Sequence, residues 1–129
     1  MILNSETDYA IRIVSCLAES DDRIDAAGIA EKTGVTPRFT LKILHRLVQG
    51  GIVKSFKGNK GGYVLARPAE DITLLQVVEE IYGPLSLSRC HSDGSCGCTH
   101  PNGICEHKDV FSDITNYMRK KLSEVTFKK

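Results

Sequence analysis

Residues 26–67, AAGIAEKTGVTPRFTLKILHRLVQGGIVKSFKGNKGGYVLAR, decide the fold of this chain. A short helix is expected at Ala26–Thr33 and should end at Gly34, because glycine accepts the left-handed conformation that closes a helix. A longer helix should begin after the capping residue Thr36 and run to Gln49. A short helix, a tight turn and a longer helix together predict a helix-turn-helix.

The longer helix divides into two faces. At about 100° per residue, its polar side chains fall within about 60° of one another; they are Arg38, Lys42, His45 and Gln49. The other side is apolar and is formed by Leu41, Ile43, Leu44, Leu47 and Val48. A recognition helix has this arrangement, since one face packs and the other contacts bases in the major groove. An ordinary amphipathic surface helix has it too, so the neighbouring segments decide between them.

A basic hairpin follows the helix-turn-helix. Ile52–Phe56 alternates like a strand and Tyr63–Leu65 supplies a second, with three glycines and two lysines in the turn at 57–62. A hairpin in this place is expected to be a wing, whose lysines contact phosphates or the minor groove. A nucleotide-binding loop is the competing interpretation, but the run lacks the glycine spacings that such loops require.

Cationic side chains are concentrated in the same segment. The whole protein has a formal charge of +1, yet residues 32–67 contain eight cations and no acidic residue, which leaves −7 for the rest. The eight are Lys32, Arg38, Lys42, Arg46, Lys54, Lys57, Lys60 and Arg67. Such segregation predicts a surface for a phosphate backbone. A solubilising face would normally mix both signs of charge.

Helices are also expected on both sides of this segment. Ser5–Asp8 has the S-x-x-[DE] pattern of a helix start, and the following apolar spacing predicts a helix to about Glu19, with Cys16 in the core. A T-x-x-Q capping box at Thr73–Gln76 opens another helix, to about Tyr82. A long terminal helix with one apolar stripe is predicted from the spacing of Phe111, Ile114, Met118, Leu122 and Val125. Because an isolated long helix usually needs a partner, we expect a homodimer.

Length and composition suit one globular domain with an added arm, at 129 residues and 41% apolar. We expect a mainly α (α+β) fold: a winged helix-turn-helix domain over residues 1–84, a cysteine-rich loop over 85–107, and a dimerisation helix with a C-terminal tail over 108–129. No apolar run is long enough to span a bilayer, and the N-terminus does not read as a secretory signal. A cytoplasmic location with reduced thiols is therefore expected.

The expected loop concentrates metal-binding side chains. Four of the five cysteines and three of the four histidines lie within 90–107; they are Cys90, Cys96, Cys98, Cys105, His91, His100 and His107. Crowded thiolates select iron–sulfur clusters, zinc or Cu(I) over hard cations. The usual C-x2–4-C zinc pairs are missing, since one residue separates Cys96 from Cys98. A thiol switch remains open, although it needs only two of the four cysteines.

Several segments resemble one family, the IscR/NsrR/CymR regulators, also called the Rrf-two family. The most specific is Gly51–Ala69, with its Gly-Gly-Tyr-x-Leu-Ala-Arg-Pro run, and the likeness extends to Tyr9–Arg12, Asp71–Leu74 and Leu122–Thr126. The resemblance implies a winged-helix homodimer that binds a palindromic operator in double-stranded DNA and regulates transcription, typically as a repressor. The DNA contacts that it implies are Thr36, Arg38, Phe39, Thr40 and Lys42 on the recognition helix and Lys57, Asn59 and Lys60 in the wing.

The resemblance also favours an iron–sulfur cluster, [2Fe–2S] or [4Fe–4S], held by the loop. Cluster-binding members carry three cysteines there; Cys90 and Cys105 match the outer two, and Cys96 and Cys98 both fit the middle position. The extra cysteine permits an all-thiolate site. Otherwise the resemblance implies His107 as fourth ligand, or Asp8 reaching across the dimer. The ordinary role of Asp8 is to stabilise the first turn of its helix.

The sequence therefore predicts a DNA-binding regulator whose operator affinity depends on cluster status, through redox, nitric oxide or iron sensing. One alternative is a cluster-free regulator controlled by a thiol switch or a protein partner. The cysteine-metabolism members imply it, although they generally lack the loop cysteines. Another is a metal-stabilised interaction module without DNA binding. An enzyme is not expected, because no nucleophile–base pattern, no phosphate loop with the correct spacing and no paired carboxylates in an apolar context are found.

Overall fold

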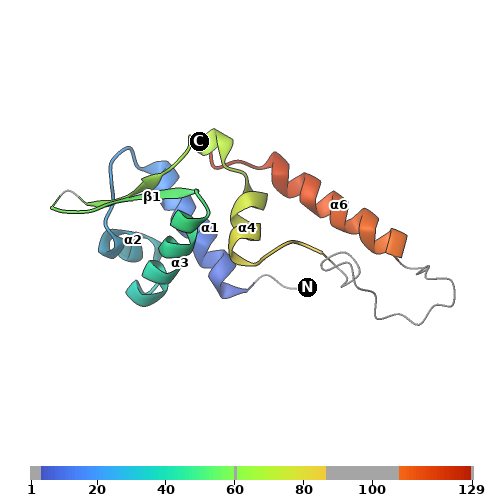
Figure 1. Ribbon diagram of the computed structural model, residues 1–129, viewed down its shortest axis with the longest axis horizontal. Coiled ribbons are helices and arrows are strands. Elements are labelled where there is room, and N and C mark those ends of the chain that lie inside the picture. The colour runs from blue at the N-terminus through green and yellow to red at the C-terminus, as the bar shows by residue number, and fades with distance from the viewer. Residues whose placement is uncertain (1–3, 60, 87–107, 129) are drawn as a thin grey trace.

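The computed structural model describes residues 4–59, 61–86 and 108–128. In these ranges five α-helices, a short 3-10 helix and a two-stranded antiparallel sheet form a winged helix-turn-helix, as predicted (Figure 1). In chain order they are α1 Ser5–Glu19, α2 Ala26–Thr33, α3 Pro37–Gln49, β1 Val53–Phe56, β2 Gly62–Leu65, η1 Ala69–Asp71, α4 Leu74–Ile81 and α6 Lys108–Glu124. None of the helices in the described ranges has the length and apolar character to cross a membrane.

Local capping sets the boundaries of the helix-turn-helix. Gly34 ends α2 in the left-handed region, with φ at 75°, and its N–H donates to the Ala30 carbonyl. Thr36 caps α3 by accepting a hydrogen bond from the Phe39 N–H. Both predicted boundaries are confirmed, and so is the capping box of Thr73 that opens α4.

The predicted start of α1 was wrong in one respect. The cap is Asn4, whose side-chain oxygen accepts a hydrogen bond from the Thr7 N–H at 2.9 Å, and Ser5 is already helical. Asparagine and serine cap helices about equally well, so the sequence pattern alone does not distinguish two adjacent candidates.

One apolar core joins α1, α3, α4 and the base of the sheet. On α3 the predicted packing residues Ile43, Leu44 and Leu47 are buried, but Leu41 is 52% exposed and that prediction is wrong. Thr40 is fully buried in its place, and its hydroxyl lies 3.5 Å from the Val35 carbonyl oxygen, which accepts its hydrogen bond. Thr40 is one and two turns from Leu44 and Leu47, whereas Leu41 lies beside the polar face.

The wing is a short hairpin whose second strand, β2, also pairs with a residue before α2. Its register runs from Val53 opposite Leu65 to Phe56 opposite Gly62. Near the turn, Tyr63 on β2 also forms a bridge with Ile24, and the Tyr63 N–H donates to the Ile24 carbonyl at 2.8 Å. The turn requires glycine at position 61, because an added Cβ would lie 2.7 Å from the Phe56 carbonyl oxygen.

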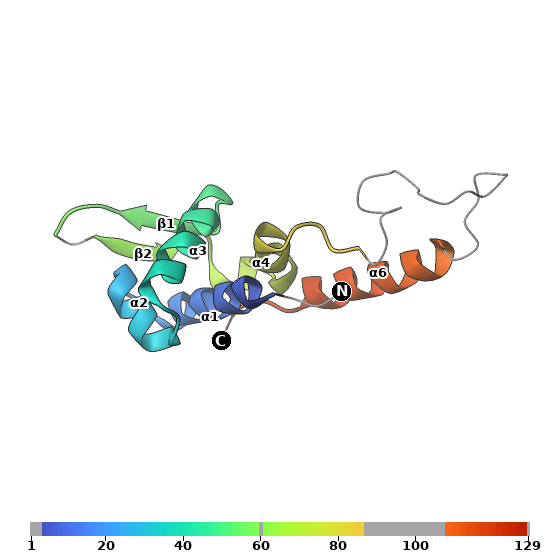
Figure 2. The ribbon, with the colours of Figure 1, turned by 90° about the horizontal axis from the view of Figure 1, so that it is seen from below.

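Helix α6 lies at the opposite end of the molecule from the wing in both views (Figures 1 and 2). It packs on α4, where Arg119 forms a salt bridge with Glu79. After α6 the chain returns to the domain, and the Leu74 N–H donates to the Val125 carbonyl at 2.9 Å. The predicted long helix is confirmed, but much of its apolar surface is exposed: Val110, Phe111, Ile114 and Tyr117.

Candidate nucleic-acid interface

The outward face of α3 is a polar, solvent-exposed surface close to the wing in the chain. Its predicted polar residues Arg38, Lys42, His45 and Gln49 are all exposed. The opposite side of α3 is buried against α1 and α4. The core therefore holds the helix with this face turned to solvent, which is what a recognition helix requires.

The start of α3 adds further exposed side chains. Thr36 is exposed at the cap, and Phe39 is 40% exposed while its ring lies 5.9 Å from that of Tyr9. Thr40 differs from the other predicted contacts, because its side chain has no exposed surface. In this conformation Thr40 cannot contact DNA. Leu41, predicted to pack, instead adds an apolar side chain to the exposed face.

Two cations of α3 have partners within the protein. The Lys42 Nζ lies 2.6 Å from a carboxylate oxygen of Glu6, on the first turn of α1. Arg46 lies 3.6 Å from the other oxygen of Glu6 and donates to the Glu80 carbonyl at 3.1 Å. The hydrogen bond from Lys42 lowers the pKa of Glu6 below its usual 4.5, against a smaller opposing effect of desolvation; the charges of Lys42 and Arg46 also lower it.

The wing presents its predicted contacts to solvent. Lys57 and Asn59 are exposed at the turn, and Lys54 is exposed on β1. Lys60 lies outside the described residues. Sequence reasoning missed Arg23, whose guanidinium lies 3.7 Å from the centre of the Phe56 ring on β1. Arg23 comes before the acid-free segment, so only the pairing of Ile24 with the wing brings it to this surface.

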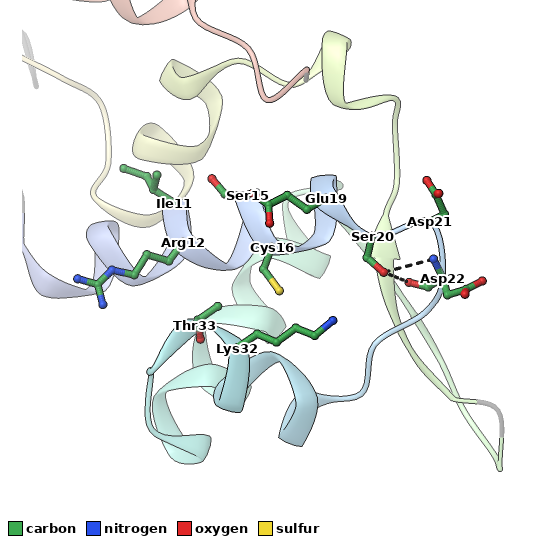
Figure 3. Close-up of a pocket in the computed structure, with 10 residues that line it drawn as sticks. All are labelled: Ile11, Arg12, Ser15, Cys16, Glu19, Ser20, Asp21, Asp22, Lys32 and Thr33. Carbon is green, nitrogen blue, oxygen red and sulfur yellow. Dashed lines mark hydrogen bonds between the residues drawn. The ribbon is translucent and has the colours of Figure 1, made fainter.

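An open groove of about 820 Å³ separates α1 from α2 (Figure 3). The Cys16 thiol points from α1 toward Lys32 and Thr33 on α2. Cys16 packs against the core, as predicted, but is only half-buried there. Burial raises the pKa of the Cys16 thiol, an effect that Lys32 partly offsets and Glu19 increases. Because the thiolate is the reactive form, Cys16 is poorly suited to be a nucleophile or a metal ligand.

The predicted metal ligands fall mostly outside the described residues, namely Cys90, Cys96, Cys98, Cys105 and His107. Within the described ranges no group of three or more His, Cys, Asp or Glu residues could hold a metal ion. Asp8 is described: it is exposed on the first turn of α1 and lies 2.9 Å from a guanidinium nitrogen of Arg12.

Comparison with known proteins assigns the chain to a family. The family model of Rrf2, described as an iron-dependent transcriptional regulator, matches residues 3–129. The chain belongs to the Rrf2 family. It is accordingly a transcriptional regulator and not an enzyme.

Individual relatives of this Rrf2 regulator are similar over most of its length. Protein aau3 of Rhizobium meliloti is 34% identical over 99 residues, which are 76% of this chain and 64% of that protein. This chain thus spans somewhat less than two thirds of that relative.

Two solved Rrf2-type structures show the same fold at low identity. CymR (YrzC), the global cysteine regulator of B. subtilis, superposes with a TM-score of 0.79 at 20% identity, covering 98% of this chain and 93% of CymR. IscR of T. potens gives a TM-score of 0.76 at 21% identity, covering 98% of this chain and 83% of IscR. Since one is a cysteine regulator and the other an IscR, the fold leaves the controlling signal open.

Proposed function

We propose that this Rrf2 regulator binds duplex DNA by placing α3 in the major groove and the wing along the adjacent backbone. The observation that carries the proposal is the division of α3. Leu44 and Leu47 anchor one side in the core, while Arg38 and His45 are exposed on the other. A rigidly held helix with a polar outward face matches the way helix-turn-helix proteins read base edges.

The proposed contacts follow from side-chain chemistry. Arg38 has donors that suit the O6 and N7 atoms of guanine. Lys42 is assigned to a phosphate of the adjacent backbone. Thr36 and Phe39 lie at the start of the helix, where hydroxyl and ring can contact backbone and base edges. Lys57 and Asn59 are assigned to phosphates because they are exposed in the turn of the wing, and Lys60 is assigned to them from the sequence alone. Thr40 is omitted because it is buried.

We further propose a homodimer formed through α6, acting on a palindromic operator in the cytoplasm, where transcription takes place. Val110, Ile114 and Tyr117 share one side of α6 and are 45–62% exposed. Large apolar side chains gathered on one helix face are typical of an interaction site. In such a dimer the two α3 helices would have to reach half-sites about 34–36 Å apart. This division of labour keeps the expected boundaries of the DNA-binding domain, the cysteine-rich loop and the dimerisation helix.

The cysteine-rich loop is proposed to hold an iron–sulfur cluster. The donor set fits, because Cys90, Cys96, Cys98 and Cys105 offer four soft thiolates within sixteen residues. His107 and Asp8 are the further candidates. The side chain of Asp8 is 56% exposed and paired only at the surface with Arg12, so exchanging that partner would cost little. A bound cluster would supply a redox- and nitric-oxide-sensitive centre.

Control of DNA binding is proposed to follow from the position of the loop in the chain. Residues 87–107 connect the segment after α4 to α6. Ligand binding by these cysteines would restrict the path between the DNA-binding domain and the dimerisation helix. The distance between the two α3 helices, and with it operator affinity, would then depend on whether the cysteines are occupied.

DNA binding is tested with a fluorescein-labelled duplex of about 30 base pairs of mixed sequence, in fluorescence anisotropy over about 50 to 200 mM salt. The proposal expects binding that weakens steeply with salt, and tighter binding to duplexes selected from a random library. Failure to bind any duplex at low salt would refute it.

Cluster binding is tested by anaerobic purification. The proposal expects a brown protein with iron and acid-labile sulfide in equal amounts, lost when loop cysteines are replaced one at a time by serine. Cys16→Ser is the matched control and should keep the iron. A colourless, iron-free protein whose DNA affinity responds to thiol oxidants would instead support the cluster-free regulator.

A further inference from the structure

A carboxylate on the first turn of α1, that of Glu6, contacts the recognition helix. Glu6 and Lys42 are 36 positions apart in sequence, yet the Lys42 Nζ lies 2.6 Å from the Glu6 Oε1. The second oxygen of Glu6, Oε2, lies 3.6 Å from Arg46. One carboxylate thus contacts two cations of α3.

The two cations differ in how firmly other groups hold them. Arg46 is half-buried and also donates to the Glu80 carbonyl, which ties α3 to α4. The Lys42 side chain is 55% exposed and belongs to the polar face proposed to meet DNA. Its other described contact is the Phe39 ring, 5.9 Å away. Lys42 is therefore the cation that DNA and Glu6 can both reach.

The contact is ionic at all physiological pH values. Lys42 donates to Glu6 and lowers its pKa below the usual range, so Glu6 remains a carboxylate. A carboxylate oxygen offers a lysine the same kind of charge-assisted hydrogen bond as a phosphate oxygen. The negative charge of Glu6 beside the Lys42 ammonium group partly neutralises it, so a phosphate attracts Lys42 less strongly than it would attract an unpaired lysine.

We propose that Glu6 is a positioning residue that competes with DNA for Lys42 and so lowers the affinity of the regulator for DNA of any sequence. The inference rests on the proposed DNA-binding function. Sequence-independent affinity comes mainly from phosphate contacts, whereas specificity comes from base contacts. By masking one lysine, Glu6 reduces binding to competing genomic sites while the base contacts of the other residues remain.

The test compares Glu6→Gln with the unaltered protein on the mixed-sequence duplex. Exposed ion pairs change equilibria by a factor of about 1.5 to 5, so binding should tighten by about that factor for each α3 engaged. The slope of log K against log salt should steepen by about 0.9 for each phosphate contact that Lys42 gains. Glu31→Gln is the matched control: it removes an exposed carboxylate from α2, in the same DNA-binding module, and should change affinity less.

A double-mutant cycle with Lys42→Met assigns the effect to this pair. Glu6→Gln should have little effect on DNA affinity when Lys42 is already replaced. An equal gain in both backgrounds would overturn the proposal, since it would reflect net charge alone. The proposal would also be overturned if Glu6→Gln, in the protein that retains Lys42, left the affinity for DNA unchanged or weakened it. Thermal unfolding of each variant ensures that only folded proteins are compared.

The same series separates the inference from the function on which it rests. If the unaltered protein binds the duplex and Lys57→Ala weakens binding, DNA recognition stands whatever Glu6 does. If the unaltered protein binds no duplex at low salt, the proposed function itself fails. A library selection adds a second measure: Glu6→Gln should bind unselected duplexes more tightly while the ratio of selected to unselected affinity falls.

Discussion

Helices α3 and α6 are both amphipathic, but the apolar stripe of α3 is buried whereas that of α6 is largely exposed. On α3, Ile43, Leu44 and Leu47 are at most 1% exposed. On α6, Ile114 is 45% and Tyr117 is 62% exposed. Helical periodicity alone predicts a packing face on each. The difference is in what covers that face: the apolar side of α3 is buried by other parts of the same chain, whereas much of the apolar surface of α6 is left exposed.

The largest expected effect tests the buried side of this comparison. Leu44→Ala should lower the free energy of unfolding by about 2–5 kcal/mol, because it removes a fully buried side chain and leaves a cavity. Chemical denaturation followed by circular dichroism measures the change. Leu41→Ala, on the same helix but 52% exposed, is the control and should cost less than about 1 kcal/mol. Equal losses for the two variants would contradict the assigned packing of α3.

The next largest effect is expected on the exposed apolar stripe of α6. Ile114→Glu places a charge on the apolar stripe of α6 and should weaken the proposed dimer at least tenfold, about 1.4 kcal/mol. The domain should stay folded, because Ile114 is not part of the core. Sedimentation measures the dissociation constant. Asn116→Glu, on an exposed part of the same helix, should leave association nearly unchanged; if it dissociates the protein equally, the stripe is not the interface.

A smaller effect is expected at the wing, where Lys57 is exposed in the turn. Lys57→Ala should reduce the steepness of log K against log salt by about 0.9 for each wing that contacts DNA. Affinity should fall by a similar factor for every duplex sequence, since a phosphate contact carries no base information. Anisotropy titrations at several salt concentrations measure both quantities. Discrimination that changes between sequences would instead place Lys57 at a base edge.

The smallest effect concerns the contact between α1 and α3. The pKa of Glu6 is lowered in the folded protein, so its ion pair stabilises fully above the ordinary pKa of 4.5. That stabilisation is lost as the pH falls through the lower folded value. The difference in urea midpoint between the unaltered protein and Glu6→Gln should therefore shrink below about pH 4.5. A difference that stays constant down to about pH 3 would show that the ion pair does not contribute.

Much of the fold was predictable because its signals are local. The caps at Thr36 and Thr73 and the turn at Gly34 act on their own backbone within a few residues, and all three lie where the sequence predicts. Prediction failed where two neighbouring positions were nearly equivalent. Asn4 rather than Ser5 caps α1, and Thr40 rather than Leu41 is buried, because helical spacing does not say which edge of a stripe meets the core.

The cationic residues of the candidate interface were predictable from the sequence, but some of the contacts that they make were not. An acid-free run of cations identified the basic segment, and the structure places Arg38, Lys42 and Lys57 on exposed surfaces. Two features depended on contacts between distant segments: Arg23 stacked on the wing, and Glu6 paired with Lys42. The ligand set of the cysteine-rich loop stays a prediction from the sequence.

The amino-acid sequence by itself determined the order of the elements, the basic segment and the family, since each depends on residue types at short spacings. Only the tertiary structure decided that Thr40 rather than Leu41 is buried on α3, which apolar stripe is left uncovered and which lysine is held by a carboxylate. Those outcomes depend on how helices far apart in sequence pack together. Packing is set by the shape of the whole core, which no short spacing encodes.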